Sequence, residues 1–237
     1  MKLFEDDVVV LAGATGRVGR PLVGRLLDEG ARLVLISRSP HEGAERVLPI
    51  IADLTKGDAG KRVIDEAVAQ YGRIDAVISL AGGGSRFVAV VDSTIDDMET
   101  SVRNNLVVAY NLFLPALRQA LRQPMRAGRR SRARFVAVTA GSSVDPQPRF
   151  GIMGAGKAGV NTFMRAIARE HKGDGIVSNA VVLGGVATLE AREYLSPEDF
   201  EAAASPEEVA NILAFHASDA STGVNGELIH LNAREVD

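Results

Sequence analysis

The feature that most constrains the fold is a regular alternation of short apolar runs, rich in β-branched residues, with longer amphipathic stretches. The short runs predict strands at residues 8–12, 32–37, 47–51, 75–80, 134–139, 176–183 and 228–231. Helical patterns occupy residues 17–29, 58–71, 95–122, 153–171 and 206–217. Most of the runs are apolar throughout, which is typical of strands buried on both faces of a parallel sheet. The sequence therefore predicts an α/β fold, a doubly wound parallel sheet of seven strands with helices on both faces.

Length and composition narrow the classes of function. The chain has 237 residues with neither a linker nor an internal repeat, so we expect one domain over residues 1–237. Its 46% apolar and 24% charged residues are typical of a globular protein with a large core. The formal net charge of −3 provides no basic field to attract nucleic acid. Cysteine is absent and the four histidines are scattered, which excludes disulfides and thiolate chemistry and argues against a metal site.

The sequence also bears on location. No window reaches the ~18 uncharged apolar residues of a membrane span. Residues 1–7 contain three acids and one lysine, whereas a secretion signal starts basic and then turns apolar. We expect a cytoplasmic protein.

A glycine-rich segment lies between the first predicted strand and the first predicted helix. It reads Gly13-Ala14-Thr15-Gly16-Arg17-Val18-Gly19. Glycine permits a tight turn there and lets backbone N–H groups approach a pyrophosphate at the helix start. We expect this loop, with Gly13, Thr15, Gly16, Arg17, Val18 and Gly19, to hold a dinucleotide. The alternative is a merely tight strand–helix turn.

The end of the second predicted strand indicates which dinucleotide is preferred. NAD-preferring sites place a carboxylate there to hold the ribose 2′-hydroxyl. This chain has Arg38 instead, whose guanidinium can pair with a 2′-phosphate, and Arg17 can assist. NADP(H) is therefore favoured over NAD(H), unless Arg38 is only a surface arginine.

Seven further segments, in order along the chain, resemble motifs of the short-chain dehydrogenase/reductase family. They are 51–54, 74–83, 104–106, 156–160, 183–188, 205–210 and 222–227. The resemblance implies a single-domain Rossmann fold and a role for each matching residue. Asp53 and Leu54 would hold adenine, Ala81 and Gly82 would line the cofactor, Asn105 and Lys157 would belong to the active site, and Gly184, Val186 and Thr188 would form the turn at the nicotinamide amide. The chain departs from the family at Ala12, Ser79 and Leu80, and the proline before Gly184 is lost.

The catalytic positions depart further. The family uses a tyrosine four residues before its lysine as the proton donor, and that position is Met153, whose thioether carries no transferable proton. The family's serine position falls on Ala140, with Ser142 in reserve two residues later. Tyr194, in a segment expected to cover the substrate at about 184–204, is a substitute donor or simply a packing residue.

Three functions stay open at this point. The first is an NADP-dependent oxidoreductase acting on a small substrate, with another group or an activated substrate replacing the tyrosine. The second is a non-redox isomerase, cyclase or dehydratase on the same scaffold. The third is a non-catalytic NADP-binding sensor or partner subunit. The first two predict a closed pocket lined by residues 184–200, and the third tolerates a filled or exposed one.

Two further expectations concern surfaces. Seven arginines and no acid occur in residues 118–134. We interpret this run as the solvated end of a helix and its following loop, with a docking surface for an anionic partner as the alternative. The resemblance implies a homodimer or homotetramer formed through the helices at 95–122 and 153–171.

Overall fold

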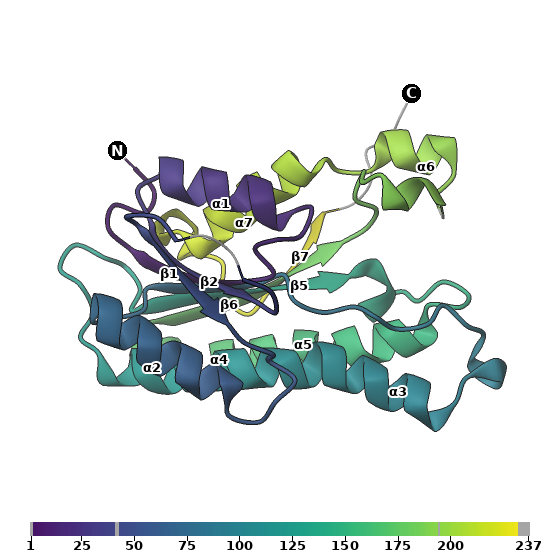
Figure 1. Cartoon of the computed structure of the whole chain (residues 1–237), viewed down its shortest axis with the longest axis horizontal. Helices are drawn as coiled ribbons and strands as arrows, with labels where there is room; N and C mark the ends of the chain where they lie inside the picture. Colours follow the sequence, from purple (N-terminus) through teal and green to yellow (C-terminus); the bar gives the residue numbers. More distant parts are fainter. Residues whose placement is uncertain (1, 41–42, 194, 232–237) are drawn as a thin grey trace.

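The computed structural model describes residues 2–40, 43–193 and 195–231 and contains a seven-stranded parallel sheet (Figure 1). The strands lie in the order β3-β2-β1-β4-β5-β6-β7. Their bounds are β1 Val8–Ala12, β2 Arg32–Ser37, β3 Val47–Ile51, β4 Ala76–Ser79, β5 Ala133–Ala140, β6 Ile176–Leu183 and β7 Leu228–Leu231. The predicted fold class is confirmed, and only β4 and β5 differ from the predicted strand bounds.

Helices cover both faces of the sheet, as Figure 1 shows. On one face lie α1 Gly19–Asp28 and α7 Pro206–Ala217. On the other lie α2 Ala59–Tyr71, α3 Ile95–Val102, α4 Val108–Arg122 and α5 Gly151–Glu170. A short helix that the sequence analysis did not predict, α6 Pro197–Ala202, projects beyond the strand ends. In the part of the chain described, no helix combines the length and apolarity that crossing a bilayer needs.

The core consists of two layers, one on each side of the sheet. Along β1, Val8, Val10 and Ala12 pack into one layer and Val9 and Leu11 into the other. Because successive side chains of a strand point to opposite faces, a central strand buried on both sides must be apolar at every position. This explains why the strand runs of the sequence do not alternate.

The predicted helix at 95–122 is confirmed in its bounds, but it is not α-helical throughout. A π-helical turn at Arg103–Val107 joins α3 to α4, and α4 contains Pro115. A π turn holds one more residue than an α turn and often occurs at functional sites. Asn105, one of the predicted site residues, belongs to this turn.

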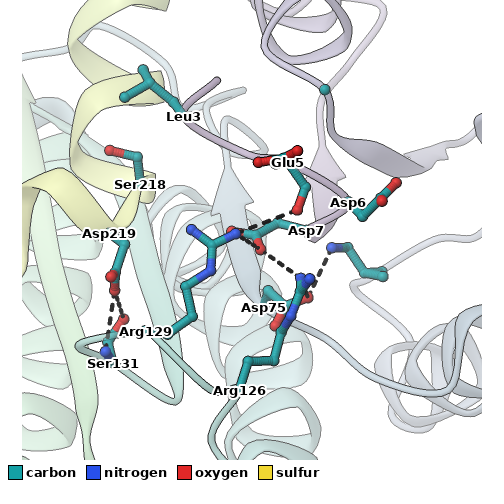
Figure 2. Close-up of polar contacts among 12 residues, drawn as sticks. Leu3, Glu5, Asp6, Asp7, Asp75, Arg126, Arg129, Ser131, Ser218 and Asp219 are labelled. Atoms are coloured by element: carbon teal, nitrogen blue, oxygen red, sulfur yellow. Dashed lines mark hydrogen bonds and ion pairs between the residues drawn. The ribbon is translucent and has the colours of Figure 1, made fainter. Parts of the chain in front are cut away.

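Only part of the arginine run is the solvated surface that the sequence suggested. Arg118, Arg122 and Arg130 are exposed, but the remaining arginines of the run are not. Arg134 is 2% exposed, and its guanidinium bonds to the carboxylate of Asp7, which is fully buried (2.7 Å). Arg126 and Arg129 reach the same carboxylate at 2.9 and 2.6 Å (Figure 2). We call Asp7 and these three arginines the Asp7 cluster. Burial raises the pKa of Asp7, and the guanidinium groups oppose that shift.

The cluster lies where β1, β4 and β5 begin. Asp75, just before β4, accepts a hydrogen bond from the backbone N–H of Val8 (3.0 Å) and pairs with Arg73 (2.8 Å). Asp219 accepts from the backbone N–H and the hydroxyl of Ser131 (Figure 2) and from Arg134. The amino-terminal edge of the sheet is therefore held together by ion pairs between segments far apart in sequence.

Asp7→Asn is expected to lower the free energy of unfolding by about 3 kcal/mol, because it removes the nearer of the two carboxylates that pair with the buried Arg134 and leaves only Asp219. Urea denaturation measures the loss, with Asp145→Asn as the matched control at an exposed acid. Equal stability of the two variants would contradict the role given to the Asp7 cluster.

Candidate active site

A cleft of about 400 Å³ opens at the carboxyl edge of the sheet, where the chain crosses from one side of β1 to the other. In doubly wound sheets this switch point is where ligands bind. Eight of the predicted cofactor residues line the cleft, namely Gly13, Thr15, Gly16, Arg38, Asp53, Leu54, Ala81 and Gly82. Arg17, Val18, Gly19, Lys157, Gly184, Val186 and Thr188 are not among its lining residues.

Two glycines of the first loop occupy positions that a side chain would not fit. Gly13 has φ +88°, and a Cβ there would lie 2.9 Å from Leu80 Cβ. A Cβ at Gly19, the first residue of α1, would lie 2.3 Å from the carbonyl oxygen of Gly13. The loop therefore folds back tightly onto the helix start, which brings backbone N–H groups close to the cleft.

One basic and one acidic side chain, Arg38 and Asp53, line the outer end of the cleft. Asp53, after β3, accepts hydrogen bonds from the backbone N–H and hydroxyl of Thr55 (3.0 and 2.7 Å). These bonds hold the pKa of Asp53 below its usual value, so the carboxylate is ionised at neutral pH. Arg38, after β2, is exposed at the cleft. A guanidinium at this position can meet a phosphate entering from solvent.

Asn105 and Lys157 approach the same glycine from two helices. The Asn105 side chain is buried, accepts from the N–H of Gly83 (2.9 Å) and donates to the carbonyl of Ser101 (2.9 Å). A Cβ added at Gly82 would lie 2.7 Å from Asn105 Oδ1 and 2.7 Å from Lys157 Nζ. The π turn thus aims Asn105 at the loop after β4, and the absence of a side chain at Gly82 lets both polar groups converge there.

The ammonium of Lys157 lies in a low-dielectric setting. Its Nζ donates to the carbonyl oxygen of Val138 (3.0 Å), and burial lowers its pKa to about 8. Desolvation disfavours the charged amine, so this lysine is poised to lose or gain a proton near neutral pH. Met153 is half-buried one helical turn earlier, on the same face of α5.

Ser142 lies beside this helix. It belongs to the short helical turn Gly141–Ser143 after β5, and a Cβ at Gly154 would lie 2.2 Å from its carbonyl oxygen. The Ser142 hydroxyl is buried without a hydrogen-bond partner among the described residues. Ser143, in contrast, donates to Ala140 and accepts from Asn161. Of these two serines, Ser142 is therefore the one whose hydroxyl is not already engaged by a described residue, although this hydroxyl is buried and does not line the cleft.

The segment after β6 forms a loop that is closed at its base. Val186 bridges Ala204, and the N–H of Ala187 donates to the Ala204 carbonyl (2.9 Å). Gly184 donates to the Leu231 carbonyl, while the Thr188 hydroxyl accepts from the N–H of Ala191 (3.3 Å). None of the described residues of this loop lines the cleft, and Tyr194 lies outside the described residues.

Sequence reasoning missed several cleft residues. Ser37, Thr55, Gly83, Gly84 and Asn104 also line the cleft. Gly82, Gly83 and Gly84 have φ values of +146°, +103° and +73°, so this run of three glycines was itself the signal of an unusual loop. Thr55, two residues after Asp53, has the spacing of an Asx turn.

Comparisons with known proteins agree with this architecture. A family model described as enoyl-(acyl carrier protein) reductase matches residues 13–233. A short-chain type dehydrogenase/reductase of Picea abies is 26% identical over 258 residues, covering 97% of this chain and 92% of the relative. A chloroplastic NADPH-dependent aldehyde reductase-like protein of Arabidopsis thaliana is 25% identical over 256 residues, covering 95% of this chain and 92% of the relative. The structure of a tyrosine-to-phenylalanine variant of ElxO with NADPH bound has a TM-score of 0.85 at 18% identity, covering 96% of this chain and 97% of that one.

Lys157→Met is expected to remove a pH dependence of stability. The pKa of an unfolded lysine, about 10.4, exceeds the folded value of about 8, so the unfolded state binds more protons between these pH values. The wild-type free energy of unfolding should therefore rise, relative to the variant, by about 2 kcal/mol from about pH 8 to about pH 10. Urea denaturation of both proteins across this range measures the difference, and a constant difference would contradict the burial of a charged amine.

Proposed function

The chain belongs to the short-chain dehydrogenase/reductase family, and we propose that it is an NADP(H)-dependent oxidoreductase with an atypical active site. The observation that carries the proposal is the convergence of Asn105 and Lys157 on Gly82, beside a cleft whose outer end bears Arg38. This is the cofactor-holding half of the family's site, with Met153 in the place of its proton donor.

The preference for NADP(H) rests on the charges at the outer end of the cleft. Among the lining residues Asp53 is the carboxylate, and its Oδ1 is engaged by Thr55. Arg38 is exposed there and matches a 2′-phosphate. The Arabidopsis thaliana relative is described as NADPH-dependent and the ElxO variant was solved with NADPH bound, which supports the same preference.

When bound, the nicotinamide would supply or accept a hydride. Gly13, Thr15 and Gly16 would hold the pyrophosphate, Asp53 and Leu54 the adenine, and Lys157 the nicotinamide ribose. Arg17, Val18 and Gly19 would position the helix start behind that phosphate. Ala81 and Gly82 would form the inner wall of the cleft, and Gly184, Val186 and Thr188 would border the nicotinamide.

Proton supply determines which substrates suit this site. Met153 has no proton to give, and the Ser142 hydroxyl can donate a hydrogen bond to a substrate oxygen or nitrogen. Hydride transfer to an activated C=C bond leaves an enolate that can take its proton from water, and a protonated C=N bond already carries its proton, so these substrates tolerate Met153 best. We therefore propose a small activated alkene or imine as the substrate class, covered by residues 184–204 of a single domain spanning residues 1–237.

Met153 also supports a second candidate, a non-catalytic NADP(H)-binding sensor or partner subunit. That protein would keep the cleft and Lys157 but would need no proton donor. Turnover of bound NADPH with activated alkenes separates this candidate from the oxidoreductase.

The proposal extends to how copies of this chain assemble and to the cell compartment in which they act. Tyr110 on α4 is 49% exposed and packs against Phe163 of α5, with ring centroids 5.6 Å apart. Leu112, Val160 and Ile167 of the same two helices are buried in the core and are not exposed to a partner. We propose a cytoplasmic homodimer or homotetramer formed through these aromatic side chains.

Arg38→Ala is expected to weaken NADPH binding about tenfold, through the loss of a charge-assisted hydrogen bond, and to leave NADH binding unchanged. Calorimetric titration of both cofactors measures the two effects. Arg118→Ala, at an exposed arginine of α4 that does not line the cleft, is the matched control. Equal losses for NADPH and NADH would overturn the role of Arg38, and the absence of any dinucleotide binding by the wild type would overturn the proposed function.

Met153→Tyr is expected to create carbonyl reductase activity, because a hydroxyl would then lie one turn before Lys157. NADPH oxidation in the presence of a panel of small aldehydes and ketones measures the gain, with Met153→Phe as the control for ring size. A variant that binds NADPH as the wild type does and reduces none of these carbonyls would show that more than the proton donor has been lost.

A further inference from the structure

A second cavity lies at the amino-terminal edge of the sheet, opposite the cleft. Its volume is about 450 Å³, and it is bounded by the second half of α5, the start of β6 and the turn before β7. Four basic side chains line it: Arg130, Arg165, Arg169 and Lys172. Glu227 is the acidic residue among the described lining. The cavity therefore carries an excess of positive charge in a protein whose net charge is −3.

These four charges are not compensated within the described ranges. No ion pair joins Arg130, Arg165, Arg169 or Lys172 to another residue of residues 2–40, 43–193 and 195–231. The neighbouring Arg126, Arg129 and Arg134 all bond to Asp7. Within the arginine run, Arg126, Arg129 and Arg134 therefore build the sheet edge, whereas Arg130 lines a cavity.

Helix stabilisation explains only part of this arrangement. Cations near the carboxyl end of a helix interact favourably with its dipole, which accounts for Arg169 and Lys172 at the end of α5. Arg165 lies one turn earlier, and like charges at this spacing repel each other. Arg130 comes from a different segment, the loop before β5. Two separate parts of the chain therefore bring uncompensated cations to one cavity.

Part of the lining leaves room for a ligand because it has no side chains. Gly175, Gly223 and Gly226 are among the lining residues. The amide of Asn225 holds the turn before β7 in place, since it accepts from the N–H of Ser178 (2.9 Å) and donates to the carbonyl of Ile176 (3.1 Å). The cavity thus combines cationic side chains with stretches of backbone that a ligand can approach closely.

We propose that this cavity binds a small soluble anion carrying two or more phosphate groups. Guanidinium groups match phosphate oxygens in bidentate geometry, and several phosphates are needed to neutralise four cations. The volume is within the range of small-molecule sites, and a concave cavity suits a small molecule better than the surface of an acidic protein. The site is separate from the cleft that holds Arg38, so it does not depend on the proposed function.

Calorimetric titration with inorganic tripolyphosphate tests the proposal. The key variant replaces Arg165 and Arg169 together by serine. The matched control replaces Arg118 and Arg122, which are also exposed and one turn apart, on α4 outside the cavity. Arg38→Ala reports on phosphate binding in the cleft. Thermal unfolding of each variant checks its fold, and Lys172→Ser, in the turn after α5, provides a second probe should the double variant fail to fold.

The expected result is saturable binding that weakens about tenfold or more in the Arg165→Ser/Arg169→Ser variant, and by less in Lys172→Ser, through lost charge-assisted hydrogen bonds. The Arg118→Ser/Arg122→Ser variant should bind as the wild type does. Arg38→Ala removes only tripolyphosphate bound in the cleft, so it should keep the binding that Arg165→Ser/Arg169→Ser weakens. Equal weakening in both double variants, weakening confined to Arg38→Ala, or no binding to the wild type would overturn the proposal. A polyaspartate peptide that bound as tightly as tripolyphosphate would also overturn it, in favour of an acidic protein partner.

Discussion

The fully buried carboxylate of Asp7 is the interaction on which the arrangement of the sheet depends. It precedes β1 and receives guanidinium groups from Arg126, Arg129 and Arg134, the last of which belongs to β5. Asp75 ties the start of β4 to β1 through the Val8 N–H. Because side chains alternate along a strand, a slip of one residue at this edge would reverse the faces of a whole strand. The ion pairs thus add specificity to a sheet whose central strands are apolar along their whole length.

Local sequence patterns were enough to predict most of this fold. They did not reveal the ion pairs between residues that are far apart in the sequence. Strands such as β1 and β6 have bounds that follow from continuous apolar runs between turn residues, because double burial requires those residues. The Asp7 cluster joins residues more than a hundred positions apart, so a run of arginines looked solvated. The π turn at Arg103–Val107 was equally invisible, since one extra residue in a helical turn barely changes an amphipathic pattern.

In the candidate site, too, single residues were predictable from the sequence, whereas the contacts between distant residues were not. The sequence singled out Gly13, Asp53, Asn105 and Lys157, and the structure brings Gly13 and Asp53 to one cleft and Asn105 and Lys157 to the adjoining Gly82. What spacing alone could not reveal is that Ser142 has a buried hydroxyl without a partner among the described residues, because that depends on the packing of distant segments. The polar groups proposed to hold a cofactor therefore lie at the cleft and at Gly82, while Met153, one turn before Lys157, carries no transferable proton.

Helix α5 links the two ends of the molecule. It carries Met153 and Lys157 near its first turns and Arg165 and Arg169 near its last. Lys157 and Arg165, the nearer of the two arginines, are eight residues apart, which at a rise of ~1.5 Å per residue separates them by ~12 Å, too far for direct contact. A ligand in the basic cavity would therefore not touch Lys157. Any coupling between the two sites must act through the packing of α5 against β6, the strand that leads from the basic cavity to residues 184–204.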